Sequence, residues 1–239
     1  MQGDCLEMMN AIADKSIDLI LCDLPYGTTA CKWDSIIPFD LLWKQYHRIS
    51  KENTPIVLFA AQPFTTKLIQ SNFKNYRYNW YWKKKNVTGF SYARFQPMRC
   101  VEDICVFYKK MPTYNPQGLI KVENPRLRKG HKTNGGVYDS EYLSNAYKTL
   151  FTNYPKHLIE FPKDKQNFHP TQKPIALLEY LIKTYTNEGE TVLDNCMGSG
   201  STGVACLNTK RKFIGIEKDN KYFETAKQRI NDVAFSLHK

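Results

Sequence analysis

The chain has 239 residues, enough for one α/β domain with an insertion or at most two small domains, and too few to hold a second enzyme. Its 34 Lys and Arg residues against 23 Asp and Glu residues give a formal charge of +11, which favours a polyanionic partner. The longest apolar stretch, residues 56–61, is far short of a membrane span, and no charged-then-apolar leader is present. The composition therefore predicts a soluble, cytoplasmic protein with no membrane partner.

The cysteines are odd in number, lack any C-x-x-C pair and mostly lie inside apolar segments. Such residues are typical of a reduced protein interior. The seven are Cys5, Cys22, Cys31, Cys100, Cys105, Cys196 and Cys206. A structural zinc site would need a paired spacing that is absent, so we predict no metal.

The first predicted strand, residues 16–22, runs into the tetrad Asp23-Leu24-Pro25-Tyr26. A carboxylate can accept a hydrogen bond from an exocyclic amino group, a neighbouring backbone carbonyl can accept a second one, and a tyrosine ring can stack on a heterocycle. The tetrad predicts a pocket that holds the amino nitrogen of a flat ring as a nucleophile. The alternative is a strand that ends in a turn, because Asp, Pro, Tyr and Gly27 all suit a loop.

Apolar periodicity predicts a helix at residues 39–49, a strand at 55–61, a helix at 64–70 and strands at 78–83 and 103–108. Within the last part of this stretch, basic residues alternate with aromatic ones. Three lysines and an arginine there are candidates for contact with a nucleic-acid backbone, namely Lys83, Lys84, Lys85 and Arg94. A solvated basic surface over a buried aromatic strand is the other interpretation.

Residues 111–166 are rich in Asn, Gly, Pro, Lys and Arg, with only brief candidates for regular structure at residues 141–150 and 157–161. We predict an inserted region of low periodicity. Its basic run offers charges for phosphates and forked donors for guanine edges. The candidates for these contacts are Arg126, Arg128, Lys129 and Lys132. A flexible solvated loop would have the same composition.

The hexapeptide at residues 169–174, His-Pro-Thr-Gln-Lys-Pro, precedes a predicted helix at residues 174–185. Pro174 is expected at the first helical position, and Thr171 or Gln172 can satisfy exposed backbone donors. Capping accounts for the proline and the threonine, but it does not account for the whole hexapeptide.

The predicted strand at residues 191–194 leads through a turn with three glycines into a helix at residues 201–207, which lets a ligand approach the backbone closely. Glu217 follows the next strand, about 20 residues beyond the first glycine, where a carboxylate can hold both hydroxyls of a ribose. No G-K-[ST] follows the turn, and Asp194 suits a cationic amino or sulfonium group better than a diphosphate. The pattern predicts a nucleoside cofactor, the alternative being a tight turn that uses glycine for packing.

A strand at residues 212–216 and an amphipathic helix from about residue 220 complete the pattern. Strands and helices that alternate in this way predict an α/β fold with a mostly parallel, Rossmann-like sheet covered by helices on both faces.

These segments together resemble the amino-methylating DNA methyltransferases that use S-adenosylmethionine, in the circularly permuted group whose catalytic motif precedes the cofactor motif. The tetrad at residues 23–26 resembles the family's D-P-P-Y, and residues 194–203 resemble its D-P-F-x-G-S-G-T-T. Residues 3–6 resemble the G-D-C-L-E segment that lines the cofactor's adenine, and residues 169–174 resemble the segment preceding the cofactor strand.

The resemblance implies the class I methyltransferase fold with a seven-stranded sheet, whose strand before Asp4 is almost absent here. It divides the chain into a catalytic half at residues 1–110, an inserted target-recognition region at 111–166 and a cofactor-binding half at 167–239. Leu24 and Asn195 stand where the family usually has proline. Since the family uses only the carbonyl of the second tetrad residue, leucine supplies the acceptor as well as proline does.

By this resemblance, the protein is expected to transfer the sulfonium methyl to the N6 amino group of adenine in double-stranded DNA. Asp23 and the Leu24 carbonyl would hold the two amino hydrogens, and Tyr26 would stack on a base rotated out of the duplex. The four tetrad residues, Pro25 included, form the expected catalytic site. The cofactor site is expected at Asp4, Cys5, His169, Thr171, Lys173, Pro174, Asp194, Asn195, Gly198, Ser199, Gly200, Ser201, Thr202 and Glu217.

Other functions are compatible with the same motifs. N4 of cytosine is the first alternative, although a leading Asp in the tetrad is commoner in the family's adenine enzymes. Methylation of RNA or of a protein glutamine is a second alternative, and a nucleic-acid-binding module that catalyses nothing is a third. The resemblance also makes a homodimer and a cognate restriction endonuclease candidate partners, as in restriction-modification systems.

Overall fold

A computed structural model describes residues 1–28, 34–128, 146–166, 168 and 172–237. Five residues singled out above lie outside the described residues, namely Cys31, Lys129, Lys132, His169 and Thr171. By its internal contacts the chain divides into two units. One comprises Met1–Asn115 with His157–Lys239, and the other comprises Pro116–Lys156.

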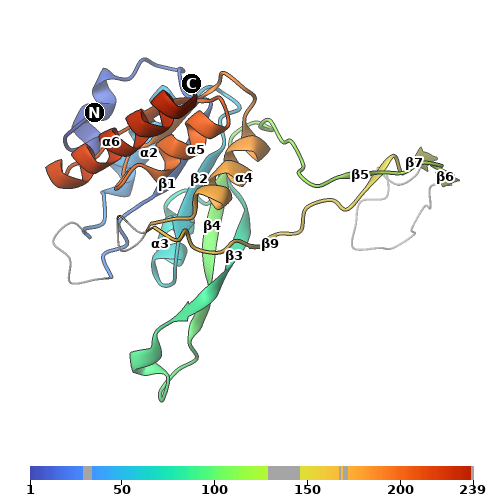
Figure 1. Ribbon diagram of the computed structural model, residues 1–239, viewed down its shortest axis with the longest axis horizontal. Coiled ribbons are helices and arrows are strands. Elements are labelled where there is room, and N and C mark those ends of the chain that lie inside the picture. The colour runs from blue at the N-terminus through green and yellow to red at the C-terminus, as the bar shows by residue number, and fades with distance from the viewer. Residues whose placement is uncertain (29–33, 129–145, 167, 169–171, 238–239) are drawn as a thin grey trace. The chain divides into compact units, whose positions relative to one another are not determined.

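The larger unit contains a seven-stranded sheet with the strand order β11-β10-β1-β2-β4-β3-β9 (Figure 1). In chain order its strands are β1 (Leu19–Asp23), β2 (Ile56–Ala60), β3 (Tyr76–Thr88), β4 (Arg99–Phe107), β9 (Leu158–Glu160), β10 (Thr191–Asp194) and β11 (Lys212–Gly215). Strands β11, β10, β1 and β2 run parallel to one another, as do β3 and β9, and β4 is antiparallel to both of its neighbours. The prediction of a mostly parallel α/β sheet is confirmed.

Helices cover both faces of this sheet because the buried strands are apolar on both sides. The helical elements are α1 (Cys5–Met8), η1 (Met9–Ala11), α2 (Phe39–Ile49), α3 (Phe64–Ser71), η2 (Phe90–Tyr92), α4 (Ile175–Tyr185), α5 (Ser201–Asn208) and α6 (Asn220–Leu237). In β1, Ile20 and Cys22 point into the core beneath α2 and α3, and Leu19 and Leu21 point into the core beneath α4 and α5. The strand therefore needs an unbroken apolar run, which is the pattern its sequence shows.

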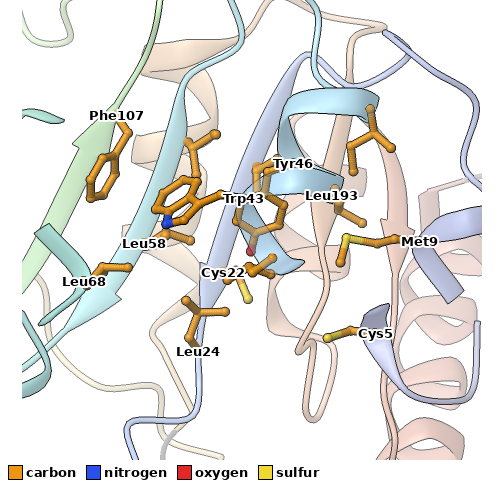
Figure 2. Packing of buried hydrophobic residues seen from close by; sticks show 14 of the residues in the cluster. Cys5, Met9, Cys22, Leu24, Trp43, Tyr46, Leu58, Leu68, Phe107 and Leu193 are labelled. Atoms are coloured by element: carbon orange, nitrogen blue, oxygen red, sulfur yellow. The ribbon is translucent and has the colours of Figure 1, made fainter. Parts of the chain in front are cut away.

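The core beneath α2 brings aromatic side chains against strand residues from both ends of the chain (Figure 2). Trp43 and Tyr46 of α2 are buried beside Leu58 of β2, Phe107 of β4 and Leu193 of β10. The apolar period of residues 39–49 predicted this helix with the bounds that the structure has. Its packing joins the N-terminal and C-terminal parts of the sheet in one core.

Two differences from the expected elements lie at the far side of the sheet. Strand β3 continues to Thr88 and β4 begins at Arg99, so that both are longer than the predicted strands. Strand β9 pairs with β3 at Tyr81, Trp82 and Lys83 and so belongs to the main sheet, although sequence reasoning assigned residues 157–161 to the inserted region. Its three residues are too few to show an apolar period.

The smaller unit, Pro116–Lys156, contains two short antiparallel pairs. β5 (Ile120–Lys121) pairs with β8 (Phe151–Thr152), and β6 (Leu127–Arg128) pairs with β7 (Tyr147–Lys148). All eight strand residues are exposed. Regular structure among the described residues of this unit is thus limited to two short, exposed strand pairs.

At the N-terminus, Gln2 forms a single parallel bridge with Glu217 just beyond β11. The Gly3 amide donates to the Glu217 carbonyl at 3.0 Å, and the Glu217 amide donates to the Met1 carbonyl at 3.1 Å. In place of the strand expected before Asp4, the described residues form this bridge of one residue pair. Among the helices formed by the described residues, none is long and apolar enough to cross a membrane.

The turn between β10 and α5 depends on Gly200, which has φ +78°. A Cβ at this position would lie 2.8 Å from the Ala226 Cβ and 3.0 Å from the Ala226 Cα on α6. Gly189 has a similar φ of +82°, but nothing lies within 4 Å of a Cβ added there. A substitution at Gly189 therefore measures the free-energy cost of the left-handed backbone conformation alone.

We expect Gly200→Ala to lower the free energy of unfolding by about 1–3 kcal/mol more than Gly189→Ala, because both bear the left-handed strain but only Gly200→Ala also overpacks the α5–α6 contact. Urea unfolding of the two variants against wild type measures the difference. Equal losses would mean that the packing around Ala226 relaxes without cost.

Candidate active site

The tetrad lies at the carboxyl end of β1, and its four side chains have different surroundings. The Tyr26 hydroxyl donates to Asp23 Oδ1 at 2.7 Å, and its ring stacks on Phe64 with 4.9 Å between centroids. Leu24 is buried in the core beneath α2, so its side chain is not available to a ligand. Pro25 is partly buried between them. Of the tetrad side chains, Asp23 and Tyr26 are the two joined by a hydrogen bond.

Lys173 joins this carboxylate to a second one that sequence reasoning did not identify. Its Nζ lies 2.5 Å from Asp23 Oδ2 and 2.9 Å from Glu102 Oε1. Glu102, on β4, also pairs with Lys84 of β3 at 2.5 Å, and its Oε1 lies 3.4 Å from the Tyr26 hydroxyl. Two carboxylates, two ammonium groups and a phenol therefore form one network at this edge of the sheet.

The two carboxylates differ in how many cations they contact. Burial and the charge of Glu102 raise the pKa of Asp23, and its one ammonium partner, Lys173, only partly opposes this. Burial would raise the pKa of Glu102 too, but Lys173 and Lys84 together hold it below the usual value. Although burial lowers the pKa of Lys173, the two carboxylates raise it above its ordinary value. Glu102 and Lys173 are thus ionised, and a proton entering the network goes to Asp23.

The glycine-rich turn is held from within by Asp194, the last residue of β10. Asp194 Oδ2 accepts from the Thr202 hydroxyl at 2.6 Å, and Oδ1 accepts from the Cys196 amide at 3.1 Å. Burial raises the pKa of Asp194 to about 6, against the opposing effect of these two donors. Near neutral pH the turn therefore encloses a buried carboxylate that is mostly ionised.

Glu217 lies beside the same turn and contacts it directly. Its Oε2 accepts from the Gly198 amide at 2.8 Å, and its Oε1 accepts from the Asp219 amide at 2.8 Å. Asp4 caps α1 by accepting from the Leu6 amide at 3.0 Å, and its second oxygen lies 3.1 Å from Lys218 Nζ. Cys5, which follows it, is buried in the core. The acids expected around a nucleoside therefore occur at one end of the sheet, just before α1, at the end of β10 and just after β11.

The start of α4 differs from the expected capping. Pro174 has φ −60° and ψ 133°, so it is the N-cap residue and lies just before the first helical residue. The Ile175 amide, at the first helical position, donates to the Asp164 carboxylate at 3.2 Å, a partner that sequence reasoning missed. Gln172 accepts from the Phe168 amide at 3.0 Å and from the Ser199 hydroxyl at 3.3 Å. Gln172 therefore connects the approach to α4 with the glycine-rich turn.

Two further contacts on this turn were not predicted. Arg229 of α6 donates to the Ser199 carbonyl at 2.5 Å and to its hydroxyl at 3.0 Å. The Tyr46 hydroxyl donates to the Asn195 side-chain carbonyl at 2.6 Å inside the core. Ser201 and Thr202, at the start of α5, are both buried. Arg229 and Tyr46 belong to amphipathic helices, where sequence periodicity indicates packing rather than a role beside a turn.

The predicted nucleic-acid contacts have different surroundings. Lys84 is largely buried and paired with Glu102, and Lys83 is half exposed and pairs with Glu160 at 3.2 Å. Lys85 and Arg94 are exposed on the continuation of β3 and the loop after it. Arg126 and Arg128 are exposed in the smaller unit. Lys84 thus belongs to the carboxylate network, while the other described candidates face solvent or an exposed ion pair.

The chain is similar in sequence to known DNA methylases. A family model described as DNA methylase matches residues 17–228. Type II methyltransferase M2.LlaDCHI of Lactococcus lactis subsp. cremoris is 48% identical over 247 residues, covering 96% of this chain and 87% of that protein. DNA adenine methyltransferase YhdJ of Escherichia coli (strain K12) is 28% identical over 252 residues, covering 97% of this chain and 82% of that protein.

Among solved structures, the complex of M1.HpyAVI with SAM matches with a TM-score of 0.65 and 26% identity, covering 96% of this chain and 97% of that chain. The parallel sheet, its two helical layers and the acidic turn at its carboxyl edge define a class I methyltransferase. The chain belongs to the N6/N4 family of DNA methylases, whose methyl donor is S-adenosylmethionine. The expectations of an amino-methylating DNA methyltransferase family, a Rossmann-like α/β fold and S-adenosylmethionine as cofactor are confirmed, whereas the circularly permuted order stays a prediction.

Proposed function

We propose that the protein methylates the N6 amino group of adenine in DNA, with Asp23 as the acceptor for the reacting amine. The observation that carries this proposal is the contact of Lys173 with Asp23, at 2.5 Å, beside the glycine-rich turn. β1 and β10 are neighbouring parallel strands, so their carboxyl ends, Asp23 and Asp194, lie at the same edge of the sheet. A methyl donor bound at one strand end can therefore reach an amine held at the other.

The reacting nitrogen is a poor nucleophile because its lone pair is delocalised into the ring. Hydrogen bonds from its two protons to Asp23 and to the Leu24 carbonyl favour a pyramidal nitrogen with its lone pair directed at the methyl group. The nitrogen–carbon bond forms as the carbon–sulfur bond breaks, and the methylated amine then loses one proton. Asp23 is the proton acceptor that the network supports, because its pKa is raised while Glu102 stays ionised.

In this proposal the cofactor contacts come from the glycine-rich turn and the acids around it. The ionised Asp194 favours a cofactor with a net positive sulfonium and amino charge, and Glu217 supplies the carboxylate for the ribose hydroxyls. Gly198, Ser199 and Gly200 form the turn that would line the cofactor, and Asp4 with Cys5 would border its adenine. S-adenosylmethionine supplies the electrophilic methyl group.

Adenine is preferred to cytosine because the tetrad begins with Asp and because a relative matching 97% of the chain is named a DNA adenine methyltransferase. The experiment is mass spectrometry of nucleosides from DNA incubated with the protein and S-adenosylmethionine. We expect N6-methyladenine. N4-methylcytosine alone would replace adenine with cytosine as the substrate, and the absence of any methylated base would contradict the proposed activity.

We propose that the unit Pro116–Lys156 is the core of the target-recognition region, within residues 111–166. Its exposed Arg126 and Arg128 support contact with phosphates or guanine edges. The relatives named Type II methyltransferases support a place in a restriction-modification system, with a cognate endonuclease that recognises the same DNA sequence. Sequencing of modified bases in cells that express the protein identifies that sequence.

A further inference from the structure

The β3–β4 hairpin extends past the sheet as a two-stranded ribbon. β4 pairs with β2 only from Asp103 onward, and β3 pairs with β9 only as far as Lys83, within the part of the chain that the structure describes. Beyond those points the ribbon continues to the pair Thr88 and Arg99. The pairing is irregular over this interval, because five steps along β3, from Lys83 to Thr88, face only two steps along β4, from Val101 to Arg99. Figure 1 shows the hairpin projecting from the other elements of the larger unit.

The tip of this hairpin exposes three aromatic side chains. Phe90, Tyr92 and Phe95 are 82%, 61% and 86% exposed. They lie on two successive turns that are closed by backbone hydrogen bonds, from the Tyr92 amide to the Gly89 carbonyl at 3.0 Å and from the Phe95 amide to the Tyr92 carbonyl at 2.9 Å. These backbone hydrogen bonds hold the tip in a defined conformation with its three rings exposed. A two-stranded ribbon is only marginally stable in water, and exposed aromatic rings bury no apolar area that would stabilise it.

The charge of the hairpin indicates the kind of partner. Residues 83–101 contain five basic residues and no acidic residue. Lys84 and Lys83 have carboxylate partners, whereas Lys85, Arg94 and Arg99 are exposed toward the tip. Exposed aromatic rings interleaved with cations match a nucleic acid, whose bases stack on the rings and whose phosphates attract the charges. A protein surface would have to be strongly acidic to accept the same face.

The base of the hairpin lies at the candidate active site. Trp82 and Glu102 are a cross-strand pair, and Glu102 contacts Lys173, which contacts Asp23. When the target base of a DNA duplex lies at Asp23, the neighbouring DNA is therefore no farther from the tip than the length of the hairpin. A base that leaves the duplex loses its stacking on both neighbours, which costs a few kcal/mol unless another flat group replaces it.

We propose that the hairpin tip binds the DNA beside the target base and stacks Phe90 and Phe95 on the bases that the rotated nucleotide leaves exposed. Lys85, Arg94 and Arg99 bind the flanking phosphates. This inference rests on the proposed DNA methylation and assigns base extrusion to residues outside both sequence motifs.

The test uses the full-length protein with S-adenosylmethionine and duplexes that carry the sequence it methylates. The variant is Phe90→Ala/Phe95→Ala, and the matched control is Phe73→Ala, which removes a 73% exposed phenylalanine from the loop between α3 and β3. Affinity for each duplex is measured together with the fluorescence of 2-aminopurine at the target position, which rises when that base unstacks.

We expect the double variant to bind the paired duplex roughly 10- to 100-fold more weakly, with a reduced fluorescence rise, while the control stays at the wild-type level. With an abasic site opposite the target base, where extrusion costs less, most of the loss should disappear. An equal loss on both duplexes, or no loss on either, would overturn the stacking role. A change from dimer to monomer with normal base extrusion would instead make the tip a subunit contact, which also overturns it.

The salt dependence of DNA binding tests the proposed phosphate contacts separately. Lys85→Gln/Arg94→Gln/Arg99→Gln is expected to reduce the slope of log affinity against log salt concentration by about 1 for each phosphate that the variant no longer binds. An unchanged slope would contradict the phosphate contacts. Wild-type protein that methylates no DNA refutes the proposed function itself, so that failure is distinct from a failure of the hairpin proposal.

Discussion

Asp23→Ala is expected to lower the rate of methyl transfer to DNA by at least about 100- to 1000-fold, because the reacting amine loses the carboxylate that orients its lone pair. Asp23→Asn keeps the volume of the side chain but loses the charge, and it should lose most of the activity as well. Binding of S-adenosylmethionine should stay close to the wild-type level in both variants, since the glycine-rich turn is held by Asp194 and Glu217. Single-turnover methylation and calorimetric titration of the cofactor measure the two effects.

Asp18→Asn is the matched control, because Asp18 directly precedes β1 and pairs with Lys51 at 2.5 Å. It removes the same charge at the opposite end of the same strand and should leave methyl transfer near normal. Asp23→Ala with normal activity would refute the catalytic assignment. Loss of cofactor binding together with activity would instead place Asp23 in the cofactor site.

Lys173→Met and Glu102→Gln are expected to move the pH profile of methyl transfer in opposite directions. Asp23 must be ionised to accept the proton that the methylated amine loses, so activity falls as the pH drops through its pKa. Lys173→Met removes the cation that stabilises the ionised form of Asp23. The pKa of Asp23 then rises further, and the acid limb of the profile moves to higher pH. Glu102→Gln removes the negative charge that competes for Lys173, so the acid limb moves to lower pH.

The measurement is the rate at saturating cofactor and DNA between about pH 5 and pH 9, and shifts of about one pH unit or more are expected for close charge pairs. Lys51→Met, which breaks the pair with Asp18 far from the network, is the control and should shift nothing. Shifts of the same sign in both variants would contradict the shared role of Lys173. Since Lys173→Met leaves two buried carboxylates without their shared cation and is the less stable variant, the direction seen with Glu102→Gln decides the test.

Much of the fold follows from local patterns in the sequence. The bounds of α2 and β10 are those that periodicity predicted, because each buries one complete apolar stripe or run. The late extension of β3 to Thr88 could not be read in this way, since from Lys85 onward its residues are exposed and only Val87 among them is apolar. A strand that packs against nothing else in its own unit leaves no hydrophobic period in its sequence.

The sequence motifs of the candidate site were predictable, but the ion pairs between its side chains were not. The tetrad and the glycine-rich turn have fixed spacings along the chain, which a sequence displays directly. Glu102 is recognised by its contact with Lys173, 71 positions away, and in the sequence it is one acid next to another, Asp103. Asp103 instead accepts from the Thr65 hydroxyl at 2.6 Å. Which of two adjacent carboxylates faces a site depends on the register of β4 against its neighbours.

Because β1 lies between β10 and β2 in the sheet, its two strand partners are synthesised at very different times. Leu19 pairs with Val192 across one edge of β1 and Ile20 pairs with Ile56 across the other. While the chain emerges from the ribosome, β2 is available early, but the partner on the other edge is β10, which begins at Thr191, 168 positions after β1 ends at Asp23. Until then an apolar strand presents an open edge that other chains can pair with. Chains whose translation stops before β10 should therefore be prone to aggregate, and they lack the glycine-rich turn of the site. Binding of chaperones to the nascent chain should end once β10 has emerged from the ribosome.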